Sequence, residues 1–393
     1  MNKISKILKI YKNSTEEIIP KEWNVKRLSQ LGTIYSGGTP DTENKEYWDG
    51  NIFWCTPSDI TQLQSKYIQS TENKITNKGL QNSSATLLPI KSIIVCTRAT
   101  IGNAAITNIE LATNQGFKNI IPNKCNTEWL FYSIIFNKLK LKRLGCGSTF
   151  LEISKKDFEN FKLLAPPLEE QKKIAEILST WDEAIEKQSK LIEKLELRKR
   201  GIMQRLLTGR TRLSGFTTPW QKVKLGDICS ITTGKLDANA MNNNGIYPFF
   251  TCAKEVYKIN QFAFDTEALL ISGNGEHLGY VHYYKGKFNA YQRTYVLNNF
   301  TQDIFYMFYT LKQNLPKRIL QTKSSSNTPY IIMETLTNME IILPDNQEQK
   351  SIANTLTTID EEINIQVKKL ETFRTQKCGL MQQLLTGKTR VNF

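Results

Sequence analysis

Apolar residues recur at alternating steps of four and three in two long segments of the chain. In the first segment these steps connect Ile174, Leu178, Trp181 and Ile185. This spacing places apolar side chains on one stripe of an α-helix and is the heptad pattern of coiled coils. It therefore predicts two long helices, each with an apolar seam. The predicted seam residues are Ile174, Leu178, Trp181, Ile185, Gln188, Ile192, Leu195, Ile202, Ile352, Leu356, Ile359, Ile363, Gln366, Leu370, Phe373 and Leu380.

The two helical segments are copies of one another. Residues 166–212 align with residues 344–390 without a gap and agree at about half of the positions. Each copy begins at a proline and ends in Leu-Leu-Thr-Gly, which are typical start and stop signals of a helix. Because an exposed apolar stripe needs a partner, we expect the two helices to pair with each other. The alternative is that each helix packs separately on its own neighbouring domain.

Polar residues interrupt both seams at equivalent places. Gln188 corresponds to Gln366, and Lys199 corresponds to Lys377. Polar residues in a coiled-coil seam fix the register and the number of partners at a cost in stability. The match therefore favours a specific pairing of the two helices.

A second, weaker repeat precedes each long helix at a distance. The segment 23–28 with Gly37 corresponds to the segment 220–225 with Gly234, and the internal spacing is preserved. The chain is therefore organised as two similar halves, each with an anchor segment, an intervening domain and a long helix.

The intervening stretches, 40–150 and 235–330, are rich in turn residues and short β-favouring runs. Residues 92–96, 268–272 and 280–284 form such runs, and their composition predicts strands. The two stretches resemble each other only loosely. The chain is therefore predicted to have an α+β fold, in which two mixed α/β domains are each followed by a long helix.

The chain is basic, with 52 Lys and Arg against 37 Asp and Glu and a net charge of +15. A positive field of this size attracts polyanions, so nucleic acid is the expected partner; the alternative is a Lys-rich composition without a ligand. Seven scattered cysteines and two histidines argue against a disulfide framework and against structural zinc. No apolar run is long enough to span a bilayer. We therefore expect a cytoplasmic protein without membrane contact.

Several short motifs occur together in this chain. Besides the two anchors, they are residues 54–60 (WCTPSDI), 97–102 (TRATIG), 113–117 (TNQGF), 166–171 (PPLEEQ) and the two Leu-Leu-Thr-Gly endings. In combination they resemble the specificity (S) subunit of type I restriction-modification systems, and the resemblance covers nearly the whole chain. The second half departs from the first where residues 97–102 are replaced by residues 273–279 (GNGEHLG). The resemblance therefore does not identify the base-reading loop of the second half.

The resemblance implies two target-recognition domains, each reading one half of a bipartite site on double-stranded DNA. It further implies that the long helices pair antiparallel as a spacer, with pseudo-two-fold symmetry. Methyltransferase (M) subunits, expected in two copies, and restriction (R) subunits would supply the chemistry. S-adenosylmethionine, ATP and magnesium would belong to those partners, with no cofactor in this chain. The implied domains are residues 1–160 (N-terminal segment and first recognition domain), 161–213 (central helical spacer), 214–338 (second recognition domain) and 339–393 (C-terminal helical spacer).

None of the catalytic motifs that the chain suggests is complete. Pro166-Pro167 lacks the Asp or Asn and the aromatic residue of an adenine methyltransferase motif, and Gly387-Lys388-Thr389 lacks the first glycine of a phosphate loop. The acidic residues Asp345 and Glu348 are interpreted as a solvated first turn of a helix. The chain is therefore predicted to be a non-catalytic DNA-binding subunit. A two-module RNA-binding or assembly scaffold is the alternative, and a nuclease with an unrecognised site is a third.

Candidate DNA contacts are polar residues in turn-rich loops that follow strand-like runs, because such loops present side chains while a sheet holds them still. Arg98 and Arg293 could bind guanine, and Gln115, Gln292 or Asn274 could bind adenine. The alternative for each is a loop side chain that is paired within the protein. The candidates are Thr97, Arg98, Thr100, Asn103, Gln115, Lys118, Ser148 and Thr149 in the first half, and Asn274, Glu276, His277, Tyr291, Gln292, Arg293, Ser325 and Asn327 in the second.

Overall fold

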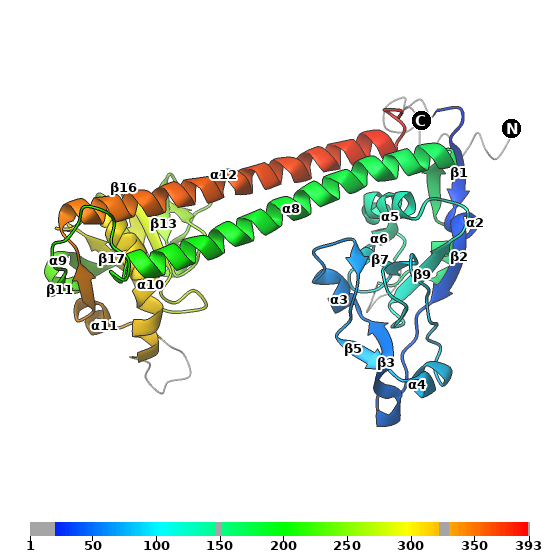
Figure 1. The fold of residues 1–393 in the computed structure, drawn as a ribbon, viewed down its shortest axis with the longest axis horizontal. Helices are drawn as coiled ribbons and strands as arrows, with labels where there is room; N and C mark the ends of the chain where they lie inside the picture. The colour runs from blue at the N-terminus through cyan, green and yellow to red at the C-terminus, as the bar shows by residue number, and fades with distance from the viewer. Residues whose placement is uncertain (1–19, 146–150, 322–329, 392–393) are drawn as a thin grey trace. The chain divides into compact units, whose positions relative to one another are not determined.

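The computed structural model describes residues 20–145, 151–321 and 330–391 (Figure 1). The chain divides into two compact units, each described here by itself. Unit 1 comprises Met1–Lys190 and Lys368–Phe393, and unit 2 comprises Leu191–Val367. The divisions fall inside the two long helices, so each unit contains part of both. The domain boundaries given by the sequence remain predictions.

Unit 1 contains a five-stranded sheet and a three-stranded sheet. An antiparallel pair, β1 (Asn24–Arg27) with β10 (Lys162–Ala165), joins the start of the unit to the segment before the first long helix. The run predicted at residues 92–96 is strand β6. The larger sheet has the order β2 (Gly32–Ser36), β9 (Phe117–Pro122), β6 (Ile93–Cys96), β7 (Ala104–Thr107) and β4 (Tyr67–Ile68), and the smaller has the order β5 (Asn73–Ile75), β3 (Trp48–Cys55) and β8 (Leu111–Thr113).

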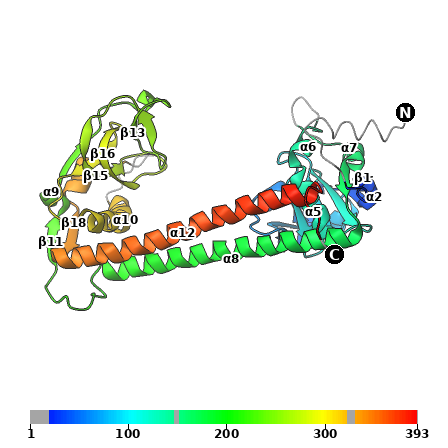
Figure 2. The ribbon, with the colours of Figure 1, turned by 90° about the horizontal axis from the view of Figure 1, so that it is seen from above.

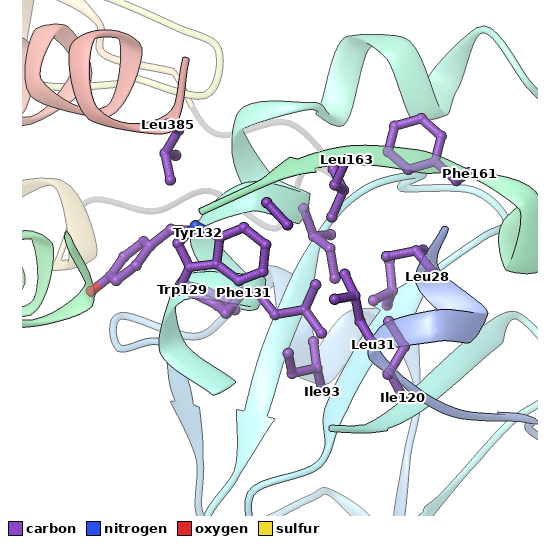
Figure 3. Packing of buried hydrophobic residues seen from close by; sticks show 14 of the residues in the cluster. Leu28, Leu31, Ile93, Ile120, Trp129, Phe131, Tyr132, Phe161, Leu163 and Leu385 are labelled. Carbon is purple, nitrogen blue, oxygen red and sulfur yellow. The ribbon is translucent and has the colours of Figure 1, made fainter. Parts of the chain in front are cut away.

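Short helices connect these strands, and α5 (Thr127–Phe136) contributes several side chains to the largest core of unit 1. Trp129 and Tyr132 of α5 are fully buried. Figure 3 shows core residues from several parts of the chain: Leu28, Leu31, Ile93, Ile120, Trp129, Phe131, Tyr132, Phe161, Leu163 and Leu385. The helices are α2 (Leu28–Leu31), η1 (Lys45–Tyr47), α3 (Pro57–Thr61), α4 (Asn77–Gln81), α5 (Thr127–Phe136), α6 (Lys138–Lys142) and α7 (Lys155–Asn160).

Unit 2 is built on one six-stranded sheet with the helix α10 (Ile304–Gln321) packed beside it. The antiparallel pair of β11 (Gln221–Lys224) with β18 (Glu340–Leu343) repeats the β1–β10 pair of unit 1. The two runs predicted in this half lie in strands β15 and β16. The sheet order is β12 (Ser230–Thr233), β17 (Thr294–Asn298), β15 (Phe264–Ser272), β16 (Val281–Ala290), β13 (Tyr247–Phe250) and β14 (Tyr257–Ile259), and the short helices are α9 (Leu225–Ile228), η2 (Ala238–Ala240) and α11 (Met333–Thr337).

The two long helices are α8 (Leu168–Leu206) and α12 (Asn346–Leu385). In unit 1 the N-terminal part of α8 lies against the C-terminal part of α12, where the rings of Trp181 and Phe373 meet edge to face at 5.7 Å (Figure 2). Unit 2 pairs the opposite parts, so the helices run antiparallel in both units. The mixed α+β fold with paired long helices is therefore confirmed.

Every predicted seam residue is buried or half-buried. The ends of the seams, however, pack on the globular cores. Ile174 and Leu178 join the core of unit 1, and Ile352 and Leu356 join the core of unit 2. Helix pairing and packing on a neighbouring domain, which were separate interpretations of the sequence, thus both occur along each helix.

Matching polar contacts hold the helix pair in each unit. In unit 2, Lys199 of α8 binds Asp360 of α12, and Tyr309 of α10 donates to the same carboxylate at 2.8 Å. In unit 1, Lys377 and Tyr132 bind Asp182 in the same way, with the roles of the two helices exchanged. Burial raises the pKa of both tyrosines, so their hydroxyls stay protonated and donate. The Lys residues that interrupt the seams therefore bind an aspartate on the opposite helix.

A second pair of matching contacts corrects one interpretation of the sequence. Glu348 is fully buried rather than solvated. Its carboxylate accepts hydrogen bonds from Arg212 at 2.6 Å and from Trp220 at 3.0 Å. In unit 1 the buried Glu170 accepts from Arg390 and Trp23 in the same way. The segment that follows each long helix thus supplies an arginine that pairs with a buried glutamate at the start of the other long helix.

These contacts predict the behaviour of a fragment spanning residues 1–213. The fragment carries Asp182 and Glu170 together with Lys199 and Arg212, so two copies can exchange the contacts that the full chain makes internally. We expect a two-fold symmetric dimer, because in an isologous pair each copy supplies the lysine and the arginine that bind the aspartate and the glutamate of the other copy. Sedimentation of the purified fragment measures this. A folded fragment that sediments as a monomer would contradict the paired-helix account.

Candidate nucleic-acid interface

In unit 1 several loops gather at one end of the five-stranded sheet. The loop after β6 lies beside the turn before β9, where the amide of Thr97 donates to the carbonyl of Gly116 at 2.8 Å. The loop after β2 reaches the same turn through a hydrogen bond from Gly37 to Phe117 at 3.2 Å. The loops that carry the described candidate residues of the first half therefore come together at one end of one sheet.

In unit 2 the corresponding end of the six-stranded sheet has the same backbone framework. The amide of Gly273 donates to the carbonyl of Arg293 at 2.9 Å, and Gly234 donates to Thr294 at 3.2 Å. The framework requires glycine at Gly37 and Gly234, because a Cβ atom there would lie 1.9 Å from a backbone oxygen of the neighbouring segment. The glycines of the weak sequence repeat thus mark the same close backbone approach in both units.

The loops after β6 and β15 also share their internal geometry. Gly102 donates to Cys96 at 2.9 Å, and Gly279 donates to Ser272 at 2.8 Å. Both glycines have positive φ, +85° and +80°, a conformation that other residues rarely adopt. Between these two hydrogen-bonded ends, the loop of unit 2 has one residue more than the loop of unit 1. Residues 273–279 are therefore the structural counterpart of residues 97–102, which the sequence resemblance did not establish.

A third segment completes each loop cluster. The amide of Ile153 donates to Thr97 at 3.0 Å, and the amide of Ile331 donates to Gly273 at 2.8 Å. Isolated bridges pair Arg98 with Glu152 in unit 1, and Asn274 with Tyr330 in unit 2. We call these two sets of segments the loop clusters. The loop cluster of unit 1 comprises residues 37–39, 97–103, 114–116 and 151–153. The loop cluster of unit 2 comprises residues 234–236, 273–280, 291–293 and 330–331.

The predicted contact residues differ in their exposure. Two of them are buried. Thr97 is fully buried and its hydroxyl donates to Gly116, while Lys118 is 5% exposed and binds Glu152 at 3.4 Å. Both therefore hold the loop cluster together instead of presenting a free side chain. Exposed residues are Gln115, Glu276, Gln292 and Arg293, and half-buried residues are Arg98, Thr100, Asn103, Asn274, His277 and Tyr291.

Four predicted residues, Ser148, Thr149, Ser325 and Asn327, lie outside the described residues. The structure in turn adds residues that sequence reasoning missed. Thr39 donates to Gln115, and the exposed Lys235 and Lys254 lie on loops at the same end of the unit 2 sheet. Lys235 directly follows Gly234 of the weak repeat, so that repeat was the available signal. Lys254 is placed there by its contact with the Tyr280 ring at 6.0 Å and by Cys252 of the same loop, which donates to the carbonyl of Arg293 at 3.4 Å.

Two further observations concern chemistry at these surfaces. His282 is half-buried, with its ring 3.0 Å from the carbonyl oxygen of Ala253, and desolvation lowers its pKa, so it holds a loop as a neutral ring. Over the described ranges, His, Cys, Asp and Glu side chains form no group of three that could hold a metal ion. Within the same ranges, none of the helices has the length and apolar character to cross a membrane.

Two modules with matching loop clusters, each joined to a long helix, define a protein that recognises its ligand at two separate surfaces. Residues 20–197 and 217–372 match the family model of the type I restriction modification DNA specificity domain. The chain therefore belongs to the family of type I restriction-modification specificity subunits.

Individual relatives agree with this assignment. The chain is 29% identical to the MjaIX type I restriction enzyme specificity subunit of Methanocaldococcus jannaschii, over 95% of both proteins. A shorter alignment is 42% identical to the EcoDI specificity subunit of Escherichia coli and covers 39% of this chain and 34% of that protein. The solved S subunit from M. genitalium aligns at 15% identity with a TM-score of 0.60, over 95% of this chain and 98% of that chain. A chain from a study of complex assembly and conformational transition of the type I R-M system aligns at 19% identity with a TM-score of 0.61, over 95% of this chain and all of that one. The two structural likenesses show a shared fold.

Proposed function

We propose that each loop cluster reads one half of a bipartite site on double-stranded DNA and that the α8–α12 pair sets the distance between the halves. One observation carries this proposal: the two units repeat the same backbone framework, while the side chains it presents differ. The loop after β6 presents Thr100 in unit 1, whereas the longer loop after β15 presents Glu276 and His277 in unit 2. A common framework with different side chains suits two similar domains that read different base sequences.

The family assignment also bears on the partners. As a type I specificity subunit the chain acts with M and R subunits on DNA and supplies recognition rather than catalysis. We propose that two M subunits bind, one to each repeat of the helix and its flanks, because the repeats offer two similar surfaces. S-adenosylmethionine, ATP and magnesium are proposed to bind those partners. The relatives give no support to the RNA-binding alternative.

Binding to duplex DNA is expected to weaken steeply as salt is raised. Lysine and arginine side chains release counterions when they contact phosphates, and a protein with roughly six to ten such contacts loses about 10³–10⁵ in affinity between about 50 and 200 mM salt. Titration of the complex of this chain with its M subunits, on a duplex that carries its methylation site, measures the slope. Single-stranded RNA of the same length is the competitor. Affinity that hardly changes with salt, or equal competition by RNA, would contradict the proposal.

A further inference from the structure

The backbone hydrogen bonds align the two loop clusters residue by residue. Thr97 bonded to Gly116 matches Gly273 bonded to Arg293. One step further along, Arg98 corresponds to Asn274, since each forms the isolated bridge to the third segment of its cluster. Each cluster therefore has one arginine at these two positions, but on different loops. Unit 1 carries it on the loop after β6, and unit 2 carries it on the turn before β17.

In unit 1 the two positions, 98 and 116, lie so close together that an arginine at either one can place its guanidinium in the same region. A Cβ atom built on Gly116 would lie 3.6 Å from the Cβ of Arg98. This is shorter than the typical distance of about 4.5–5.5 Å between facing residues of neighbouring strands. Two side chains whose Cβ atoms lie this close at the same end of the sheet can reach the same region. The arginine thus lies on different loops in the two units, at two positions of the framework that are neighbours in unit 1.

We propose that this arginine makes an equivalent DNA contact in both units, supplied by Arg98 in unit 1 and by Arg293 in unit 2. The inference rests on the proposed function and deepens it by naming a shared contact. The guanidinium is a planar fork that binds two acceptors at once, and on DNA these are the O6 and N7 atoms of guanine or two oxygens of a phosphate. Gln115 and Gln292 occupy matching exposed places beside the arginine in the two clusters. Residues that differ between the clusters, such as Thr100 in unit 1 and Glu276 in unit 2, then account for the difference between the half-sites.

The framework of unit 1 has room for the transposed arrangement. A Cβ atom on Gly116 meets the Asn114 side-chain oxygen at 3.1 Å and Pro57 at 3.8 Å, and Gly116 does not have positive φ. The same oxygen accepts the Gly116 amide at 2.9 Å, so a Cβ atom requires the Asn114 side chain to shift by a few tenths of an ångström while it keeps this hydrogen bond. Arg293 shows that the same framework carries a large exposed side chain at this position.

The test moves the arginine within unit 1 of the full chain, assembled with its M subunits. The variants are Arg98→Asn and the double variant Arg98→Asn with Gly116→Arg, which copies the arrangement of unit 2; Lys155→Ala, on the exposed surface of α7, is the control. The readouts are the methylation motif mapped in cells and the affinity for a duplex that carries the wild-type motif. Arg98→Asn is expected to lower that affinity by about 5- to 150-fold, the range for loss of a bidentate base contact. The double variant is expected to recover most of the loss.

The motif distinguishes the two forms of the contact. Relaxation of one guanine position in Arg98→Asn, restored in the double variant, identifies a base contact. An unchanged motif with uniformly weaker binding, also restored, identifies a phosphate contact. A double variant as weak as Arg98→Asn, or an Arg98→Asn variant equal to wild type, would overturn the inference. If Gly116→Arg prevents folding, Arg293→Gly and the double variant Asn274→Arg with Arg293→Gly pose the same question in unit 2. Failure of the wild-type complex to bind duplex DNA would instead refute the proposed function.

Discussion

Arg212→Ala is expected to destabilise the protein strongly, because it leaves a buried carboxylate without its charge partner. Arg212 binds both oxygens of Glu348 at 2.6 Å, and Glu348 has no exposed surface. Trp220 supplies one further hydrogen bond, which cannot neutralise the charge. Unit 2 is therefore expected to unfold at a lower denaturant concentration than in the wild type.

Equilibrium unfolding of the full chain in urea measures this effect. The matched control is Arg210→Ala, since Arg210 is an exposed arginine on the same segment and its loss is expected to cost little. Glu348→Gln in the Arg212→Ala background is expected to recover part of the stability, because it removes the unpaired charge. Equal stability of Arg212→Ala and Arg210→Ala would show that the Arg212–Glu348 pair does not stabilise unit 2.

The helices were the most predictable part of the molecule. Heptad spacing depends on residues that are neighbours along one helix, and the internal repeat doubled that signal at Ile174, Leu178 and their counterparts. The stops after the helices were also readable, because Gly209 and Gly387 adopt positive φ, +68° and +76°. Local signals of this kind need no knowledge of distant contacts.

The burial of Glu170 and Glu348 was not predictable in this way. A glutamate in the first turn of a helix is usually exposed and favoured by the helix dipole. These two are buried because an arginine far along the chain, Arg390 or Arg212, comes back to pair with them. Arg390 is 220 residues from Glu170, and no local pattern reports such a contact.

The loop clusters were less predictable than the long helices and more predictable than the buried glutamates. The predicted runs lie in β6, β15 and β16, which lead into the clusters, whereas β2, β8 and β12 were not predicted. Most of the described candidate residues lie on the cluster loops. The burial of Thr97 and Lys118 was not visible in the sequence, because it depends on other segments of the cluster, which include Gly116 and Glu152. The correspondence of residues 273–279 with residues 97–102 was hidden by the inserted residue and became clear only from the backbone hydrogen bonds.

The central claim, that the paired helices set the distance between two half-sites, predicts the effect of lengthening both helices. One heptad inserted between Lys190 and Leu191 and another between Val367 and Lys368, where the two units divide, keeps each seam in phase. Each helix grows by about 10 Å. At about 3.4 Å per base pair, the gap between the specified bases is expected to grow by roughly three base pairs. The wild-type site should then no longer be methylated.

Methylation mapping in cells that express the M subunits with the wild-type or the lengthened chain is the direct measurement. A heptad-length insertion after Ser214, in the segment between α8 and β11, is the control, because it changes the connection without changing the helix pair. The account predicts the same two blocks of specified bases with a longer gap for the lengthened helices, and an unchanged gap for the control. An unchanged gap in an assembled complex with lengthened helices would contradict it.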